Sequence, residues 1–94
     1  MQFKVIISGT VQGVGFRPFI YRTAKKNNVR GYIKNAGNSV LLLVEGTEAE
    51  ITNFLDDVKN KNPPLSRITN IDIKPCKDKK YSDFQVLKSE KQGG

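Results

Sequence analysis

Histidine and tryptophan are absent from this 94-residue sequence, and cysteine occurs once, as Cys76. Without histidine the chain has no Ser–His or Cys–His nucleophile pair and no histidine-based metal site, which excludes many hydrolases and metalloenzymes. A single cysteine cannot form a disulfide within the chain, which is typical of proteins in a reducing compartment. We therefore expect a cytoplasmic protein with no metal site.

Long hydrophobic runs are also lacking. The longest apolar stretch, residues 40–44, is far shorter than the roughly 20 residues of a membrane-spanning helix. The N-terminus begins directly with alternating apolar and polar residues, without the separate hydrophobic region of a signal peptide. The sequence therefore predicts neither a membrane span nor a signal peptide.

Acidic residues are few: 9 Asp and Glu stand against 16 Lys and Arg, a formal net charge of +7. This balance favours anionic partners, such as nucleic acid, a membrane surface or a small phosphorylated substrate. The lysines fall in short separate runs, at 25–26, 59–61 and 77–80, near the expected ends of helices and strands. Such runs more often keep a surface soluble than bind a ligand, so the charge alone identifies no site.

Apolar residues recur with two periods along the chain. In residues 2–9 they alternate with polar ones, as in a half-buried strand, and from Phe16 to Ala24 they recur every three or four positions, as in a helix. Thr47 and Glu50 have the spacing of a capping box, which marks the start of a second helix that Pro63 closes. The predicted strands are 2–9, 29–35, 40–45, 68–74 and 84–87, and the predicted helices run from 16 to 27–28 and from 47 up to the prolines at 63–64.

The order of these elements, β-α-β-β-α-β with a short final strand, is that of the ferredoxin-like arrangement. It predicts an α/β fold of the α+β sandwich kind, in which two helices pack on one face of an antiparallel sheet. We expect one domain over residues 1–90, with residues 91–94 as a tail or the start of a linker and disorder beginning at Lys88.

Residues 9–17 form a glycine-rich segment between the first strand and the first helix. Such a loop can turn several backbone N–H groups inward around one point, where the helix N-terminus adds the positive end of its dipole. Arg17 can add a two-pronged contact to phosphate oxygens. The segment has neither the Gly-Lys-Ser/Thr ending of a Walker loop nor the third glycine of a dinucleotide-binding loop. On glycine content alone, an ordinary tight connection with an exposed arginine is the better interpretation.

Asn35 ends the second predicted strand, and residues 36–39 have the composition of a turn. In this topology the second strand can lie beside the first, so that the Asn35 amide approaches the glycine-rich loop at the same edge of the sheet. Taken alone, Asn35 is better explained as a turn-forming residue.

The two segments together resemble both halves of the acylphosphatase motif. Residues 11–17, Val-Gln-Gly-Val-Gly-Phe-Arg, are followed eighteen positions after Arg17 by Asn35 within Gly-Tyr-Ile-Lys-Asn, and the resemblance covers essentially the whole chain. It implies a ferredoxin-like fold and hydrolysis of carboxyl-phosphate anhydrides, with no metal or cofactor. By resemblance Arg17 and Asn35 are the catalytic residues, and Asn35 orients the attacking water. The residues implied in binding the substrate phosphate are Gln12, Gly13, Val14, Gly15, Phe16 and Arg17.

Three further details resemble one branch of that family. They are Phe-Arg-Pro-Phe at 16–19, a short hairpin at 35–40, and Pro-Pro-Leu-Ser-Arg-Ile at 63–68. All three are similar to the N-terminal acylphosphatase-like domain of HypF-type hydrogenase maturation carbamoyltransferases. This resemblance implies carbamoyl phosphate as the substrate and the other domains of a larger maturation protein as partners. A free-standing acylphosphatase remains the alternative.

Two other functions stay open from the residues alone. A basic ferredoxin-like sheet can bind RNA, but that use needs exposed aromatic residues on the central strands. The sequence offers Phe3 on the first strand, none on the third, and an isolated Tyr32, so we do not expect nucleic acid as a partner. A regulatory domain that holds phosphate without hydrolysing it is the other alternative, and the combination of Arg17 with Asn35 argues against it.

Overall fold

Each predicted strand and helix is present, with bounds that shift by one or two residues. The structure is a computed structural model that describes residues 1–87, so the expected tail from Lys88 onward lies outside the described residues. In chain order the elements are β1 (Gln2–Thr10), α1 (Phe16–Lys26), β2 (Arg30–Ala36), β3 (Ser39–Glu45), α2 (Glu48–Asn60), β4 (Arg67–Pro75) and β5 (Phe84–Val86).

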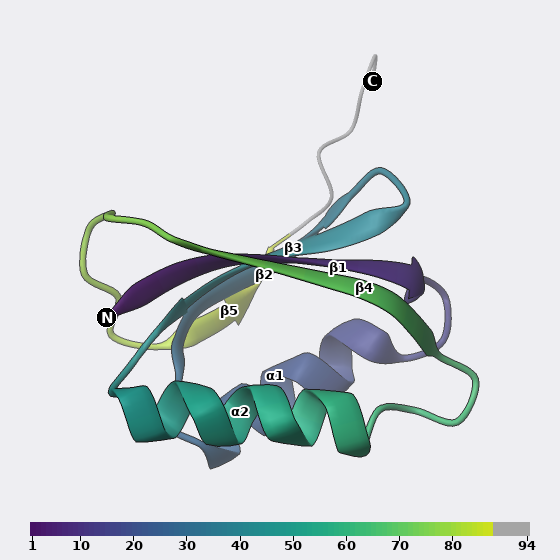
Figure 1. Cartoon of the computed structure of the whole chain (residues 1–94), viewed down its shortest axis with the longest axis horizontal. Coiled ribbons are helices and arrows are strands. Elements are labelled where there is room, and N and C mark those ends of the chain that lie inside the picture. The colour runs from purple at the N-terminus through teal and green to yellow at the C-terminus, as the bar shows by residue number, and fades with distance from the viewer. Residues whose placement is uncertain (88–94) are drawn as a thin grey trace.

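Both helices lie on one face of the sheet, as the order of elements predicts (Figure 1). The five strands lie in the order β4-β1-β3-β2-β5, and every pair among the first four strands of that order is antiparallel. β5 differs, because it pairs with β2 in parallel. The chain leaves β4 at one edge of the sheet and crosses its end through residues 76–83, so β5 enters the opposite edge in the direction of β2.

The expectation that the second strand lies beside the first is wrong. β3 lies between them and pairs with β1 on one side and β2 on the other. The reason is the width of the crossover helix: an α-helix is about 10 Å across, whereas neighbouring strands are about 4.8 Å apart. Packing α1 on the sheet therefore separates β1 from β2 by one strand, and the β2–β3 hairpin places β3 in that gap.

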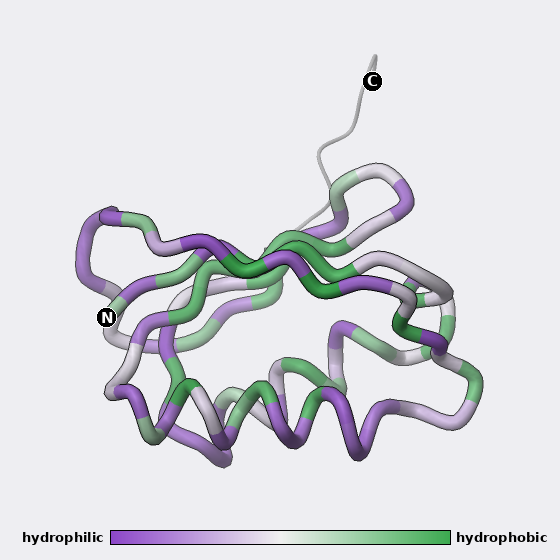
Figure 2. Tube along the Cα trace, viewed as in Figure 1, coloured by the Kyte–Doolittle hydropathy of each residue, from purple (hydrophilic) through white to green (hydrophobic). Residues whose placement is uncertain are grey.

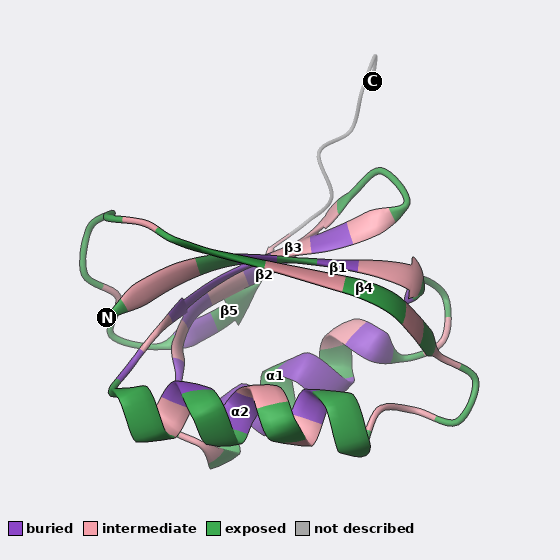
Figure 3. Ribbon diagram, in the orientation of Figure 1, coloured by how far each residue is buried: buried purple, intermediate pink, exposed green. Residues whose placement is uncertain are grey.

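The core lies between the sheet and the two helices, where the buried residues of both layers face one another (Figure 3). Hydrophobic residues alternate with hydrophilic ones along the strands and recur about once per turn in the helices (Figure 2). The buried residues of α1 are the ones that the helical period selects: Phe16, Phe19, Ile20, Thr23 and Ala24. The capping box that starts α2 is also confirmed, since Thr47 and Glu50 exchange hydrogen bonds of 2.9 and 3.2 Å.

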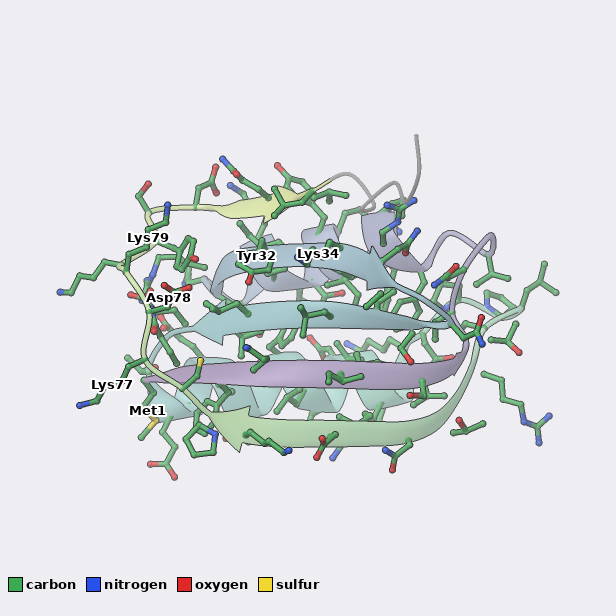
Figure 4. All side chains as sticks on the ribbon, turned by 90° about the horizontal axis from the view of Figure 1, so that it is seen from above. Met1, Tyr32, Lys34, Lys77, Asp78 and Lys79 are labelled. Carbon is green, nitrogen blue, oxygen red and sulfur yellow. The ribbon has the colours of Figure 1, made fainter. Side chains whose placement is uncertain are left out.

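The opposite face of the sheet carries no helix, and the loop at 76–83 lies along one end of it (Figure 4). There the ring of Tyr81 meets the ring of Tyr32 edge-on, with 5.9 Å between their centroids. The open face of the central strands β1 and β3 carries Lys4, Ile6, Leu41 and their neighbours, and no aromatic residue. This surface lacks the stacking platform of an RNA-binding sheet.

Glu45 holds the 76–83 loop against the strands. Its Oε1 accepts hydrogen bonds from Gln2 Nε2 at 2.9 Å and from the Tyr81 backbone N–H at 3.1 Å, and the Arg30 guanidinium lies 3.9 Å from Oε2. The hydrogen bond from Gln2 lowers the pKa of Glu45 most, and the backbone hydrogen bond from Tyr81 and the charge of Arg30 add to it, so that the pKa lies below its ordinary value of 4.5.

This lowered pKa predicts an acid-sensitive contribution to stability. Because the folded state keeps Glu45 ionised to a lower pH than the unfolded state does, the contribution is complete above pH 4.5 and is lost as the pH falls through the folded pKa. Glu45→Gln should therefore flatten the fall of the unfolding free energy below pH 4.5, as measured by urea unfolding. Asp56→Asn, on the exposed side of α2, is the control. Equal slopes in wild type and Glu45→Gln would contradict the prediction.

Candidate active site

The glycine-rich loop is stretched between two buried anchors. Val11 and Phe16 are each 1% exposed, and Val14 packs partly against the same core. Between them Gln12, Gly13 and Gly15 are exposed. The backbone of the loop is therefore fixed from below by apolar side chains while its upper surface stays open to a ligand.

Two glycines give the loop its curvature. Gly13 and Gly15 have φ angles of 75° and 78°, in the left-handed region, while Val14 between them does not. Alternating hands along successive residues turn their N–H groups toward a common point, which is the geometry of an anion-binding nest. A Cβ built on either glycine meets no atom within 4 Å, so glycine is needed here for the backbone angles and not for lack of space.

The N-terminus of α1 is open, in contrast to that of α2. Gly15 is its N-cap and supplies no side-chain hydrogen bond, and the first turn contains no acidic residue. In α2 the same positions are filled by the Thr47 cap and by Glu48 and Glu50. The first N–H groups of a helix need an acceptor, and those of α1 can receive one from an anion.

Arg17 is the second residue of α1 and is half-buried. Within residues 1–87 it forms no ion pair, and neither residues 9–17 nor residues 35–40 contain an Asp or Glu. An arginine in the first turn of a helix without a side-chain cap, and without a carboxylate partner among residues 1–87, favours a ligand with two or more negative oxygens.

Gln12 joins this loop to the hairpin that carries Asn35. Its side-chain amide donates hydrogen bonds to the backbone carbonyls of Gly37, at 2.6 Å, and Ser39, at 3.0 Å. The Gln12 side chain is thus engaged with the hairpin. Sequence reasoning missed this role, because a contact between residues 25 positions apart leaves no local pattern.

Asn35 lies near the end of β2, in one cross-strand row with Val40 of β3 and Ile7 of β1. It follows Gly31 and Ile33 on the helix-covered face, where it is the polar end of an otherwise apolar series, and its Oδ1 is shielded from solvent. The loop after β1 and the β2–β3 hairpin lie at the same end of the molecule (Figure 1). The structure therefore brings the two predicted segments together through the Gln12 side chain and not through adjacent strands.

Among residues 1–87 no three His, Cys, Asp or Glu side chains gather in a group that could hold a metal ion. Cys76 is half-exposed and lies in the loop after β4, at the opposite end of the sheet from the glycine-rich loop.

Comparison with known proteins identifies the family of this chain. The acylphosphatase family model matches residues 3–86. A probable carbamoyltransferase HypF from Methanocaldococcus jannaschii is 54% identical over 96% of this chain and 12% of its own length. The acylphosphatase of Thermotoga petrophila is 39% identical over 88% of this chain and 92% of its own length. Among solved structures, full-length HypF in a phosphate- and nucleotide-bound form matches with a TM-score of 0.91 and 38% identity, over 99% of this chain and 12% of that one.

Proposed function

The chain belongs to the acylphosphatase family of hydrolases, and on this premise we propose that it hydrolyses carbamoyl phosphate as the N-terminal domain of a HypF-type carbamoyltransferase in hydrogenase maturation. The observation that carries the proposed chemistry is the open loop at residues 12–17, in which Arg17, with no ion-pair partner among residues 1–87, lies in the first turn of α1, whose N-terminus has no side-chain cap. The Gln12 side chain joins the loop to the backbone carbonyls of Gly37 and Ser39, in the hairpin that carries Asn35.

In this proposal the glycine-rich loop and Arg17 bind the phosphate. The backbone N–H groups from Gln12 to Phe16 surround one phosphoryl oxygen or two, and the Arg17 guanidinium spans a pair of them. Because these donors are fixed by buried anchors before the substrate arrives, little reorganisation is needed as charge shifts in the transition state. The same groups are then available to the product phosphate.

Asn35 orients the attacking water. The water oxygen bonds to phosphorus as the bond from phosphorus to the acyl oxygen breaks, and the bonding electrons leave with that oxygen as a carboxylate, or as carbamate from carbamoyl phosphate. The proton lost by the water goes to solvent. Since a carboxylate is stable without a proton, the reaction needs no general acid, and positioning with charge stabilisation supplies most of the catalysis.

The setting in a larger protein is the finer part of the proposal. The chain spans 12% of the length of the HypF relative and 92% of that of the Thermotoga acylphosphatase. The higher identity to HypF favours the carbamoyltransferase context, and a free-standing acylphosphatase is the second candidate. No helix among residues 1–87 is long and apolar enough to cross a membrane. A cytoplasmic location belongs to this proposal, supported by the single cysteine.

The test is phosphate release from carbamoyl phosphate by the purified chain, with acetyl phosphate and p-nitrophenyl phosphate for comparison. We expect turnover of both acyl phosphates and none of the ester, whose leaving group is a phenolate. Activity should be unchanged by EDTA. It should also be nearly constant from about pH 5 to pH 8, because histidine is the only side chain whose ordinary pKa lies in that range and the chain contains none. Loss of turnover in EDTA would refute the metal-independent mechanism, and failure to hydrolyse carbamoyl phosphate would refute the proposed substrate.

A further inference from the structure

β4 is an edge strand whose outer side has no neighbouring strand among residues 1–87. It comes first in the order β4-β1-β3-β2-β5, with β1 on its inner side (Figure 4). It has 9 residues, whereas β5, at the opposite edge of the sheet, has 3. A long exposed edge presents unpaired backbone N–H and C=O groups, which makes it the part of a sheet that pairs most readily with another strand.

The pairing of β4 with β1 shows which backbone groups point outward. The Cys76 N–H donates to the Gln2 carbonyl at 3.1 Å, so these two residues form a hydrogen-bonded pair at the end of the ladder. Hydrogen-bonded and non-hydrogen-bonded pairs alternate along antiparallel strands. The backbone groups that point outward are therefore those of Pro75, Ile73 and Ile71. Pro75 fits such an edge position because it has no N–H to pair with β1.

Apolar surface flanks this edge on the helix-covered side of the sheet. Ile73 pairs with the buried Val5 of β1, yet 40% of Ile73 is exposed. It lines a cavity of about 260 Å³ between α2 and the edge strand. The other residues that line this cavity are Met1, Phe3, Glu48, Ile51, Thr52 and Leu55. A strand that paired with β4 would therefore also cover apolar side chains.

Opposite charges flank Ile73 on the other side of the sheet. Asp72 and Lys74 pair with Ile6 and Lys4 of β1, whose side chains lie on the face that carries no helix. The side chains of Asp72 and Lys74 are 47% and 75% exposed, and Lys74 Nζ lies 4.0 Å from Asp72 Oδ2. The edge therefore has an acidic position before Ile73 and a basic position after it.

This arrangement of charges is complementary to itself. If two copies of β4 lie antiparallel about a two-fold axis at Ile73, Asp72 of each copy faces Lys74 of the other. Moving the axis to either neighbouring residue places Asp72 opposite Asp72 or Lys74 opposite Lys74, and like charges directly opposite each other are destabilising. The two ion pairs fall at non-hydrogen-bonded positions, where side chains come closest, while the outward backbone groups form the ladder.

We propose that β4 is the docking surface for a second copy of this chain, and that the two strands pair antiparallel about Ile73 in a reversible homodimer. The sheet then runs through both copies, and Ile73 of each copy covers apolar surface of the other. The dimer is closed, because the same edge of both copies is used. It leaves the glycine-rich loop open, since that loop follows Thr10, which pairs with Arg67 at the far end of β4. The inference is therefore independent of the proposed function.

Sedimentation equilibrium of the purified chain tests the pairing. From about 10 µM to about 1 mM the mean mass should rise from that of one chain toward that of two, with a dissociation constant on the order of 10⁻⁴ M, because an edge contact is smaller than a standard interface. Asp72→Lys and Lys74→Asp should each weaken the dimer about tenfold, since both ion pairs become repulsive. The double variant Asp72→Lys/Lys74→Asp should restore wild-type affinity, because it recreates both ion pairs with their signs exchanged.

The double variant also has the wild-type net charge, so its recovery separates register from overall charge. Asp56→Lys, on the exposed side of α2, makes the same change in charge as Asp72→Lys and should leave the dimer intact. Circular dichroism checks that each variant is folded. A wild-type chain that stays monomeric up to about 1 mM would overturn the proposal. A dimer that survives both single variants, or that the double variant does not restore, would overturn it as well.

Discussion

Arg17→Ala should lower kcat/KM for carbamoyl phosphate by about three orders of magnitude, the range found when an arginine or another fixed donor is removed from a transferring phosphoryl group. The physical reason is that Arg17 is a guanidinium at the open end of α1 with no carboxylate partner among the described residues. Arg17→Lys should restore little, because a single ammonium cannot span two phosphate oxygens as the planar guanidinium does. Steady-state kinetics and phosphate titration measure both effects.

The fold should survive this substitution. Arg17 is half-buried and makes no ion pair in residues 1–87, so the free energy of unfolding should change by no more than about 0.5 kcal/mol. Lys26→Ala is the matched control, since it removes one positive charge from the last turn of the same helix. If the control loses as much activity as Arg17→Ala, net charge explains the effect and Arg17 has no special place in the site.

Asn35→Ala should separate catalysis from binding. If the amide orients the attacking water, kcat should fall by about 10²- to 10³-fold, as for other single positioned donors, while KM and the affinity for phosphate stay nearly unchanged. The motivation is its place on the helix-covered face of β2, in the hairpin that Gln12 joins to the loop. Initial rates at several substrate concentrations, with phosphate as a competitive inhibitor, provide the two constants.

Two further variants show whether Asn35→Ala changes the catalytic step or the fold of the hairpin. Asn38→Ala changes an exposed asparagine in the turn of the same hairpin and should leave kcat as in wild type. Gln12→Ala should lower kcat in the same direction as Asn35→Ala, because it frees the hairpin from the loop. A combined loss of phosphate binding and thermal stability in Asn35→Ala would instead identify Asn35 as a structural residue of the turn.

Local periodicity is the reason that the helices and strands could be predicted. The face of α1 from Phe16 to Ala24 and the capping box of α2 are properties of residues within one or two turns of each other. The glycine-rich loop could be located for the same reason, since Gly13, Gly15 and Arg17 are neighbours in the chain. The pairing of that loop with Asn35 had two supports: an expected adjacency of the first two strands, which is wrong, and the resemblance of the two separated segments to one family motif.

Contacts between distant residues decided the rest. The position of β3 between β1 and β2 follows from the width of α1. The parallel pairing of β5 with β2 follows from the path of residues 76–83 across the end of the sheet, and the residue pattern of β5 itself does not indicate it. The hydrogen bonds of Gln12 to the hairpin exist only once the chain is folded. The sequence by itself determined which segments form helices and strands, because those properties depend on neighbouring residues. Tertiary structure alone decided which side chains lie near the glycine-rich loop, because strand order and helix packing bring together residues that no local pattern connects.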